Sequence, residues 1–105
     1  MNEVWQDKIP PQDIEAEQAV LGAIFLDSDT LIDAMEIVTP RSFYRRSHQI
    51  IFQSMIQLSN RGEAIDLVTL KAEIEKSNAL EDIGGISYLS ELSQSTPSSA
   101  SVSYY

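Results

Sequence analysis

His48 is the single histidine of the chain, and histidine is the residue whose ordinary pKa lies closest to neutral pH. A histidine acts as a general base when a serine or a carboxylate is held beside it, and local spacing places no such residue next to His48. His48 falls instead on the apolar side of a predicted helix with Ile51 and Phe52, where a structural role is the more frequent one. Glu15 and Glu17 point to different faces of a helix, so they form no acid–base pair by themselves. Their position in a first helical turn favours capping and an interaction with the helix dipole.

Motifs that bind nucleotides or metals are absent from the sequence. It contains neither G-x-x-x-x-G-K-[ST] nor G-x-G-x-x-G, and its only glycine pair is Gly84-Gly85. Without cysteine and with one histidine, the usual thiolate and multi-histidine metal sites are excluded. A Mg²⁺ or Ca²⁺ site built from carboxylates alone remains an alternative, although the sequence has no EF-hand spacing. We therefore predict no catalytic, cofactor-binding or metal-binding residues, and an enzyme that uses His48 is the less favoured alternative.

Arg41, Arg45 and Arg46 form the most prominent polar cluster. Arg41 and Arg45 are four residues apart, so on a helix they would share one face. These arginines could dock an acidic partner or contact a nucleic-acid backbone, or they could balance the surrounding acids, which is the more frequent role. Tyr104 and Tyr105, at the end of the sequence, complete the set of candidate partner-binding residues.

The net charge of −9 is distributed in blocks. Residues 1–40 carry nine acids and one base, residues 41–62 carry four arginines and no acid, and residues 63–105 carry seven acids and two lysines. A domain that binds phosphate usually has a basic face, whereas most of this chain repels phosphate. The longest apolar run, residues 19–26, is too short to span a membrane, and no secretory signal is visible. The sequence predicts a soluble cytoplasmic protein without a membrane partner.

The spacing of the apolar residues predicts an all-α fold, a compact domain of about five to six short helices. Residues 1–12, which include Trp5 and a pair of prolines, predict a flexible N-terminal arm. Residues 13–97 are the expected helical globular domain. Residues 98–105 resemble the start of a further helix.

Capping residues and breaks predict where the individual helices begin and end. Asp13 is the expected N-cap of the first helix, which carries Leu21 on its buried face. A second helix over residues 31–38 should end near Thr39, where Thr-Pro restarts the chain. The remaining expected features are a turn that packs Phe43 and Tyr44 onto the core, a third helix ending at Asn60-Arg61-Gly62, a fourth capped by Asp66 and closed by Ser77-Asn78, and a short fifth ended by Thr96-Pro97.

Several short motifs occur in the order found in one protein family. The sequence resembles the N-terminal domain of DnaB-type hexameric replicative DNA helicases of bacteria over roughly residues 9–105. The motifs that carry this resemblance are Pro11 with Glu15-Ala16-Glu17-Gln18 and Val20-Leu21-Gly22, Phe43-Tyr44, His48 with Ile51-Phe52, Ile65-Asp66 with Thr69-Leu70, Gly84-Gly85 with Tyr88-Leu89, and Thr96-Pro97 with Ala100. Any one of these motifs is weak evidence, but several in register indicate membership.

The resemblance implies a scaffold at the front of a longer protein. In that family a helical hairpin and a linker follow, and residues 98–105 would be the truncated start of this hairpin. A motor domain then binds ATP and Mg²⁺, forms a hexameric ring and moves along single-stranded DNA. The N-terminal domains form a collar that docks primase, and a helicase loader is a further expected partner. The alternative is a free-standing helical adaptor or regulator that shares the fold.

Overall fold

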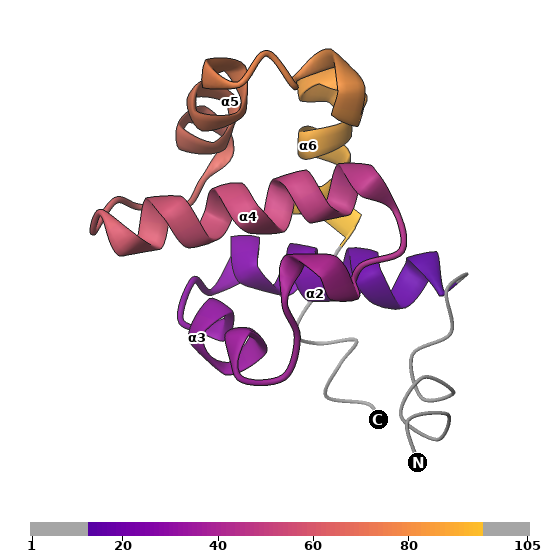
Figure 1. Cartoon of the computed structure of the whole chain (residues 1–105), viewed down its shortest axis with the longest axis vertical. Coiled ribbons are helices and arrows are strands. Elements are labelled where there is room, and N and C mark those ends of the chain that lie inside the picture. Colours follow the sequence, from indigo (N-terminus) through magenta and orange to yellow (C-terminus); the bar gives the residue numbers. More distant parts are fainter. Residues whose placement is uncertain (1–12, 96–105) are drawn as a thin grey trace.

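The computed structural model describes residues 13–95, and within this range the chain forms α-helices and short 3₁₀ helices without a strand (Figure 1). The elements are α2 (Ile14–Leu26), α3 (Thr30–Met35), η1 (Pro40–Ser42), α4 (Arg46–Asn60), α5 (Leu67–Lys76), η2 (Glu81–Ile83) and α6 (Gly85–Ser95). The predicted all-α fold is confirmed. The predicted arm 1–12, the Thr96-Pro97 break and the segment 98–105 with Tyr104 and Tyr105 lie outside the described residues.

The two N-caps that were predicted from the sequence are both present. The Asp13 carboxylate accepts a hydrogen bond of 3.1 Å from the backbone N–H of Ala16 at the start of α2. Asp66 and Thr69 form a reciprocal capping box at the start of α5, with two hydrogen bonds of 2.9 Å each. Each cap satisfies backbone donors that have no partner within the helix.

The predicted ends of α4 and α5 are also confirmed. The backbone turns out of α4 at Gly62, whose φ is +74°, a conformation that glycine adopts without steric cost. Asn78 has a φ of +56° after α5, and asparagine is among the few other residues that tolerate this region.

The second helix ends about one turn before the predicted position. α3 stops at Met35, and the backbone N–H groups of Ile37 and Val38 both donate to the carbonyl of Ala34, at 2.9 and 2.8 Å. Thr39 is extended, with φ −120° and ψ 171°, because a residue that precedes proline is sterically excluded from the helical region. The prediction of a helix that ends near Thr39 was therefore wrong, although Thr39-Pro40 does begin the 3₁₀ turn η1.

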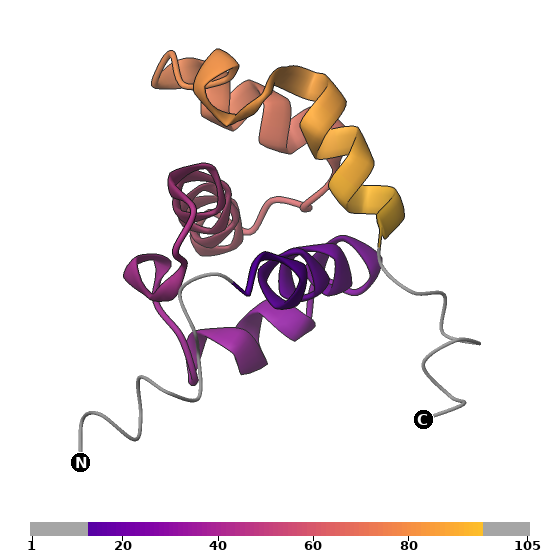
Figure 2. The same ribbon diagram turned by 90° about the vertical axis from the view of Figure 1, so that its right-hand side faces the viewer.

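The helices pack around a single apolar core (Figures 1 and 2). α4 contacts α2 on one side and α5 on the other, while α6 packs against both α2 and α5. The fully buried core side chains come from α2, α3, α4, α5 and α6, and they include Leu21, Ile24, Leu31, Ile51, Phe52, Met55, Leu70, Ile74, Leu89 and Leu92. This arrangement brings α2, α4 and α6 close together at the N-terminal end of α4.

Candidate functional site

Three polar side chains from three helices meet inside the domain. Glu17 of α2 is 6% exposed and His48 of α4 is fully buried, while Tyr88 of α6 is partly buried. His48 Nδ1 lies 2.7 Å from Glu17 Oε1, and His48 Nε2 lies 2.5 Å from the Tyr88 hydroxyl. We refer to these three residues as the Glu17–His48–Tyr88 cluster. The predicted burial of His48 is confirmed.

The hydrogen bonds of the cluster are mutually consistent when His48 is neutral. Its Nδ1–H then donates to the Glu17 carboxylate, and its Nε2 accepts the hydroxyl proton of Tyr88. The Tyr88 oxygen accepts in turn from Gln18 Nε2 at 3.2 Å and from Arg45 Nη1 at 3.4 Å. Burial lowers the pKa of His48 below its ordinary value, and the hydrogen bond to Glu17 opposes this effect only in part. His48 is therefore a neutral imidazole at neutral pH.

Glu17 also anchors the start of α4. Its Oε2 accepts a 2.6 Å hydrogen bond from the backbone N–H of Tyr44, and its Oε1 lies 3.5 Å from the backbone nitrogen of Arg45. Arg45 is the N-cap of α4 and supplies no side-chain cap of its own. A carboxylate beside the N-terminus of a helix is favoured by the helix dipole. Glu17 does lie in the first turn of α2, as predicted, but the prediction that it caps this helix was wrong, because its carboxylate is directed inward to α4, whereas Glu15 is exposed.

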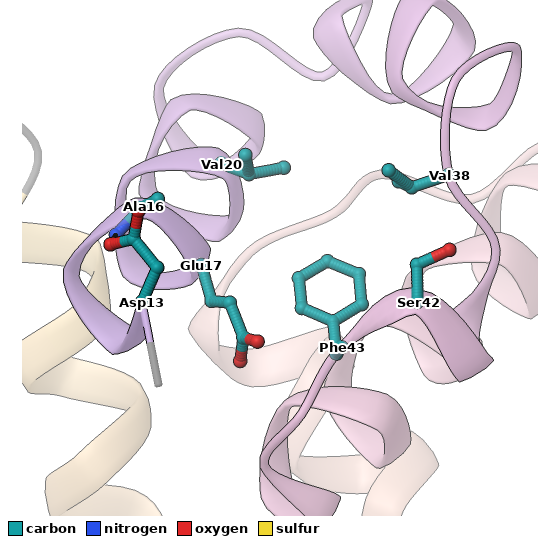
Figure 3. A pocket seen from close by; sticks show the side chains of 7 residues that line it. All are labelled: Asp13, Ala16, Glu17, Val20, Val38, Ser42 and Phe43. Atoms are coloured by element: carbon teal, nitrogen blue, oxygen red, sulfur yellow. Dashed lines mark hydrogen bonds between the residues drawn. The ribbon is translucent and has the colours of Figure 1, made fainter. Parts of the chain in front are cut away.

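Hydrolytic triads also link a carboxylate, an imidazole and a hydroxyl in this order. In this domain the three groups connect three separate helices. The hollow beside Glu17 is lined by residues that include Val20, Val38 and Phe43, and neither His48 nor Tyr88 lines it (Figure 3). The Tyr88 hydroxyl is already engaged by three neighbouring polar groups, with Gln18 and Arg45 donating to it and His48 accepting from it. The cluster thus holds α2, α4 and α6 in one arrangement.

A groove runs along the surface between α2 and the chain from α3 to η1. One hollow of about 180 Å³ is lined by Asp13, Ala16, Glu17, Val20, Val38, Ser42 and Phe43. An adjoining hollow of about 360 Å³ is lined by Ala19, Val20, Ala23, Thr30, Asp33, Ala34, Ile37 and Val38. Val20 and Val38 belong to both hollows and face each other across the first (Figure 3). We call the two together the α2–α3 groove.

The three clustered arginines occupy an exposed corner at the start of α4. Arg41 lies in η1, Arg45 is the N-cap of α4 and Arg46 is its first residue. Arg41 and Arg45 do not share a helical face, since the backbone is extended at Phe43 and Arg45. Within residues 13–95 no carboxylate pairs with this basic corner, whereas the other three cations all form ion pairs, namely Arg61 with Glu63 and Glu73, Lys71 with Glu75 and Lys76 with Glu73.

Phe43 and Tyr44, which were both expected to pack onto the core, behave differently. Phe43 is buried and lies against Phe52, with ring centroids 5.0 Å apart. Tyr44 is 62% exposed beside the basic corner, and only its backbone N–H reaches the interior. The prediction was therefore right for Phe43 and wrong for Tyr44.

No group of three or more metal-ligating side chains is positioned to hold an ion among residues 13–95. In the same range, no helix is long and apolar enough to cross a membrane.

Comparisons with known proteins identify the family to which this architecture belongs. The family model of the DnaB-like helicase N-terminal domain matches residues 9–105. The chain belongs to this family. This DnaB-like domain is 55% identical over 105 residues to the replicative DNA helicase DnaB of Geobacillus stearothermophilus and 50% identical over 105 residues to the replicative DNA helicase DnaC of Bacillus subtilis (strain 168). Each alignment covers 100% of this chain and 23% of the relative. The chain therefore spans about a quarter of the length of these curated relatives.

A solved structure supports the same assignment. The DnaB-like domain superposes on the crystal structure of the N-terminal domain of DnaB helicase from Mycobacterium tuberculosis with a TM-score of 0.81 and 42% sequence identity. The match covers 91% of this chain and 70% of that one. At this identity the likeness extends beyond the helical fold to the family itself.

The cluster was the main feature that reasoning from local spacing missed in this DnaB-like domain. Glu17, His48 and Tyr88 are far apart in the sequence, and none of them has a partner at helical spacing. A signal was nonetheless present, because each of the three belongs to one of the motifs that carried the family resemblance. Polar residues in three separate motifs of an otherwise apolar pattern are candidates for one shared network.

Proposed function

We propose that this chain is the N-terminal scaffold and protein-interaction domain of a replicative DNA helicase, that it forms part of the collar of the hexamer, and that it docks primase during DNA replication. The observation that carries the proposal is the match of the whole chain to relatives named replicative DNA helicases at 50–55% identity. The buried Glu17–His48–Tyr88 cluster supports it, because a satisfied polar network gives a docking domain one defined shape.

The remaining properties of the parent protein follow from the same proposal. ATP and Mg²⁺ would be bound by a separate motor domain, and the full-length ATP-dependent helicase would be hexameric, encircle DNA and accept a helicase loader. It would work in the cytoplasm, at the replication fork on the nucleoid. A free-standing helical adaptor or regulator is the competing proposal. A reading frame that continues from this segment to a P-loop would favour the helicase, and a frame that lacks one would favour the adaptor.

Primase binding tests the docking role. The 105-residue chain should bind primase of the same organism, measured by calorimetry. Arg46→Gln should weaken this binding by roughly fivefold if the basic corner contributes, since arginine is enriched among the residues that dominate interfaces. Lys71→Gln is the matched control, because Lys71 is an exposed cation on α5 paired with Glu75. Absence of primase binding by the unmodified chain would refute docking by this domain, while equal affinities of the two variants would refute only the role of the basic corner.

The acidity of the domain supports a second expectation. With a net charge of −9, a collar of such domains would repel phosphate and let DNA pass without being held. Fluorescence anisotropy with a labelled single-stranded oligonucleotide should detect no tight binding to the isolated chain at physiological salt. Tight binding under that condition would contradict this account of the collar.

A further inference from the structure

Exposed apolar side chains concentrate in one stretch of the chain, from the last residue of α2 to the segment after α3. Four large apolar residues between positions 26 and 37 are 41–70% exposed, namely Leu26, Ile32, Met35 and Ile37. α3 buries Leu31 and Ala34 against the core and leaves Ile32 and Met35 in solvent, so this short helix is apolar on two sides. Single exposed apolar residues are normal on a protein surface, but a group of them marks an interaction site.

Of these four residues, Ile37 is the one that lines the α2–α3 groove, and the groove matches a short helix in length. In its larger hollow the lining is apolar apart from Thr30 and Asp33. Its α2 wall runs from Ala16 to Ala23, which is about 10 Å along the helix axis. Two turns of an amphipathic helix present an apolar stripe of about the same length, in the i, i+3, i+4, i+7 pattern.

The charge around the groove selects the partner. Every charged residue between Asp13 and Thr39 is acidic, and the exposed carboxylates of Asp13 and Asp33 line the two hollows, whereas Arg41 of η1 lines neither. A second copy that presented the same face would bring like charges together, and nucleic acid or an anionic membrane would be repelled as well. A segment with basic residues beside its apolar stripe would meet complementary charge.

We propose that the α2–α3 groove binds a cationic amphipathic helix of a partner protein, with the apolar stripe of that helix in the groove and its lysine or arginine side chains at the acidic rim. This inference rests on the proposed docking function and assigns to it a surface and a partner chemistry. Ile37, which is 70% exposed, is the side chain whose surface the partner helix covers most directly.

A model peptide tests the proposal without primase, so that failure here leaves the primase test standing on its own. The probe is a Leu–Lys helix of about four turns with leucine at i, i+3, i+4 and i+7. Two peptides serve as controls: one with the same residues in scrambled order, and one with glutamate in place of lysine. Amide NMR shifts of the 105-residue chain are followed during titration at about 150 mM salt, where weak surface attraction is screened.

The Leu–Lys helix should shift the amides of Val20, Ala23 and Ile37, and both control peptides should bind at least about tenfold more weakly. Ile37→Asn should weaken binding of the helix by about tenfold, because the burial of one isoleucine side chain is worth that factor. Val68→Asn, at a 76% exposed position on α5, should leave binding unchanged. Equal binding of the scrambled or the Leu–Glu peptide, shifts centred on another face, or concentration-dependent groove shifts without any peptide, which would indicate a second copy, would each overturn the proposal.

Discussion

Replacing Glu17 by alanine removes an acceptor that two donors share inside the domain. The backbone N–H of Tyr44 donates to Glu17 at 2.6 Å, and Nδ1 of His48 lies 2.7 Å from it. A buried donor left without a partner costs about 1–3 kcal/mol. Because water can reach the Tyr44 amide more easily than the fully buried imidazole, we expect the lower part of the summed range. The free energy of unfolding should fall by about 2–4 kcal/mol.

Two further variants separate the hydrogen bonds from the general loss of a side chain. Glu17→Gln keeps the shape and one acceptor oxygen, so it should cost about half as much, about 1–2 kcal/mol. Glu15→Ala is the matched control, since Glu15 lies in the same helical turn but is exposed. Its effect should stay within about 0.5 kcal/mol.

Urea unfolding followed by circular dichroism at neutral pH measures all three variants under the same conditions. The slopes of the transitions should agree, so that differences in midpoint report stability. If Glu17→Ala is no more destabilising than Glu15→Ala, the cluster does not support the fold. A double-mutant cycle with His48→Ala isolates the pair, and a coupling energy near zero would show that the contact between Glu17 and His48 is energetically silent.

Leu21→Ala should destabilise the domain by about 2–5 kcal/mol, because Leu21 is fully buried, whereas Leu26→Ala at a 66% exposed position of the same helix should cost under about 0.5 kcal/mol in the same unfolding assay. Burial lowers the pKa of His48 below 6.5, so the unfolded chain binds a proton first and stability should fall as the pH drops through 6.5. His48 is the single histidine, and a gain of stability over that window would mean that the neighbouring carboxylate outweighs burial. Gly84→Ala should lower the thermal unfolding temperature more than Gly62→Ala does. Both glycines have a positive φ, so alanine is strained at either position. An added Cβ at Gly84 would also lie 3.0 Å from a tyrosine side chain of α6, while at Gly62 nothing lies within 4 Å. Equal losses would show that this close approach relaxes without cost.

Helix boundaries were predictable where a short stretch of sequence contains the whole interaction. Asp13 and Asp66 cap the helices that directly follow them, and Gly62 ends the helix that directly precedes it. The end of α3 was predicted about one turn too late. The apolar spacing continues through Val38, but the proline at position 40 holds Thr39 extended, and the helix had already ended by then.

By itself the sequence determined the all-α fold, the caps, the buried face of α4 and the family, because helical periodicity and motif order are properties of the chain read in one dimension. Only the tertiary structure decided what Glu17 does. Its partner His48 is 31 residues away, and His48 in turn meets Tyr88 40 residues further on. A first-turn glutamate on an exposed face and one on a buried face look the same in sequence. Which face α2 turns toward α4 and α6 depends on how all three helices pack, and that packing converts a capping residue into the anchor of another helix.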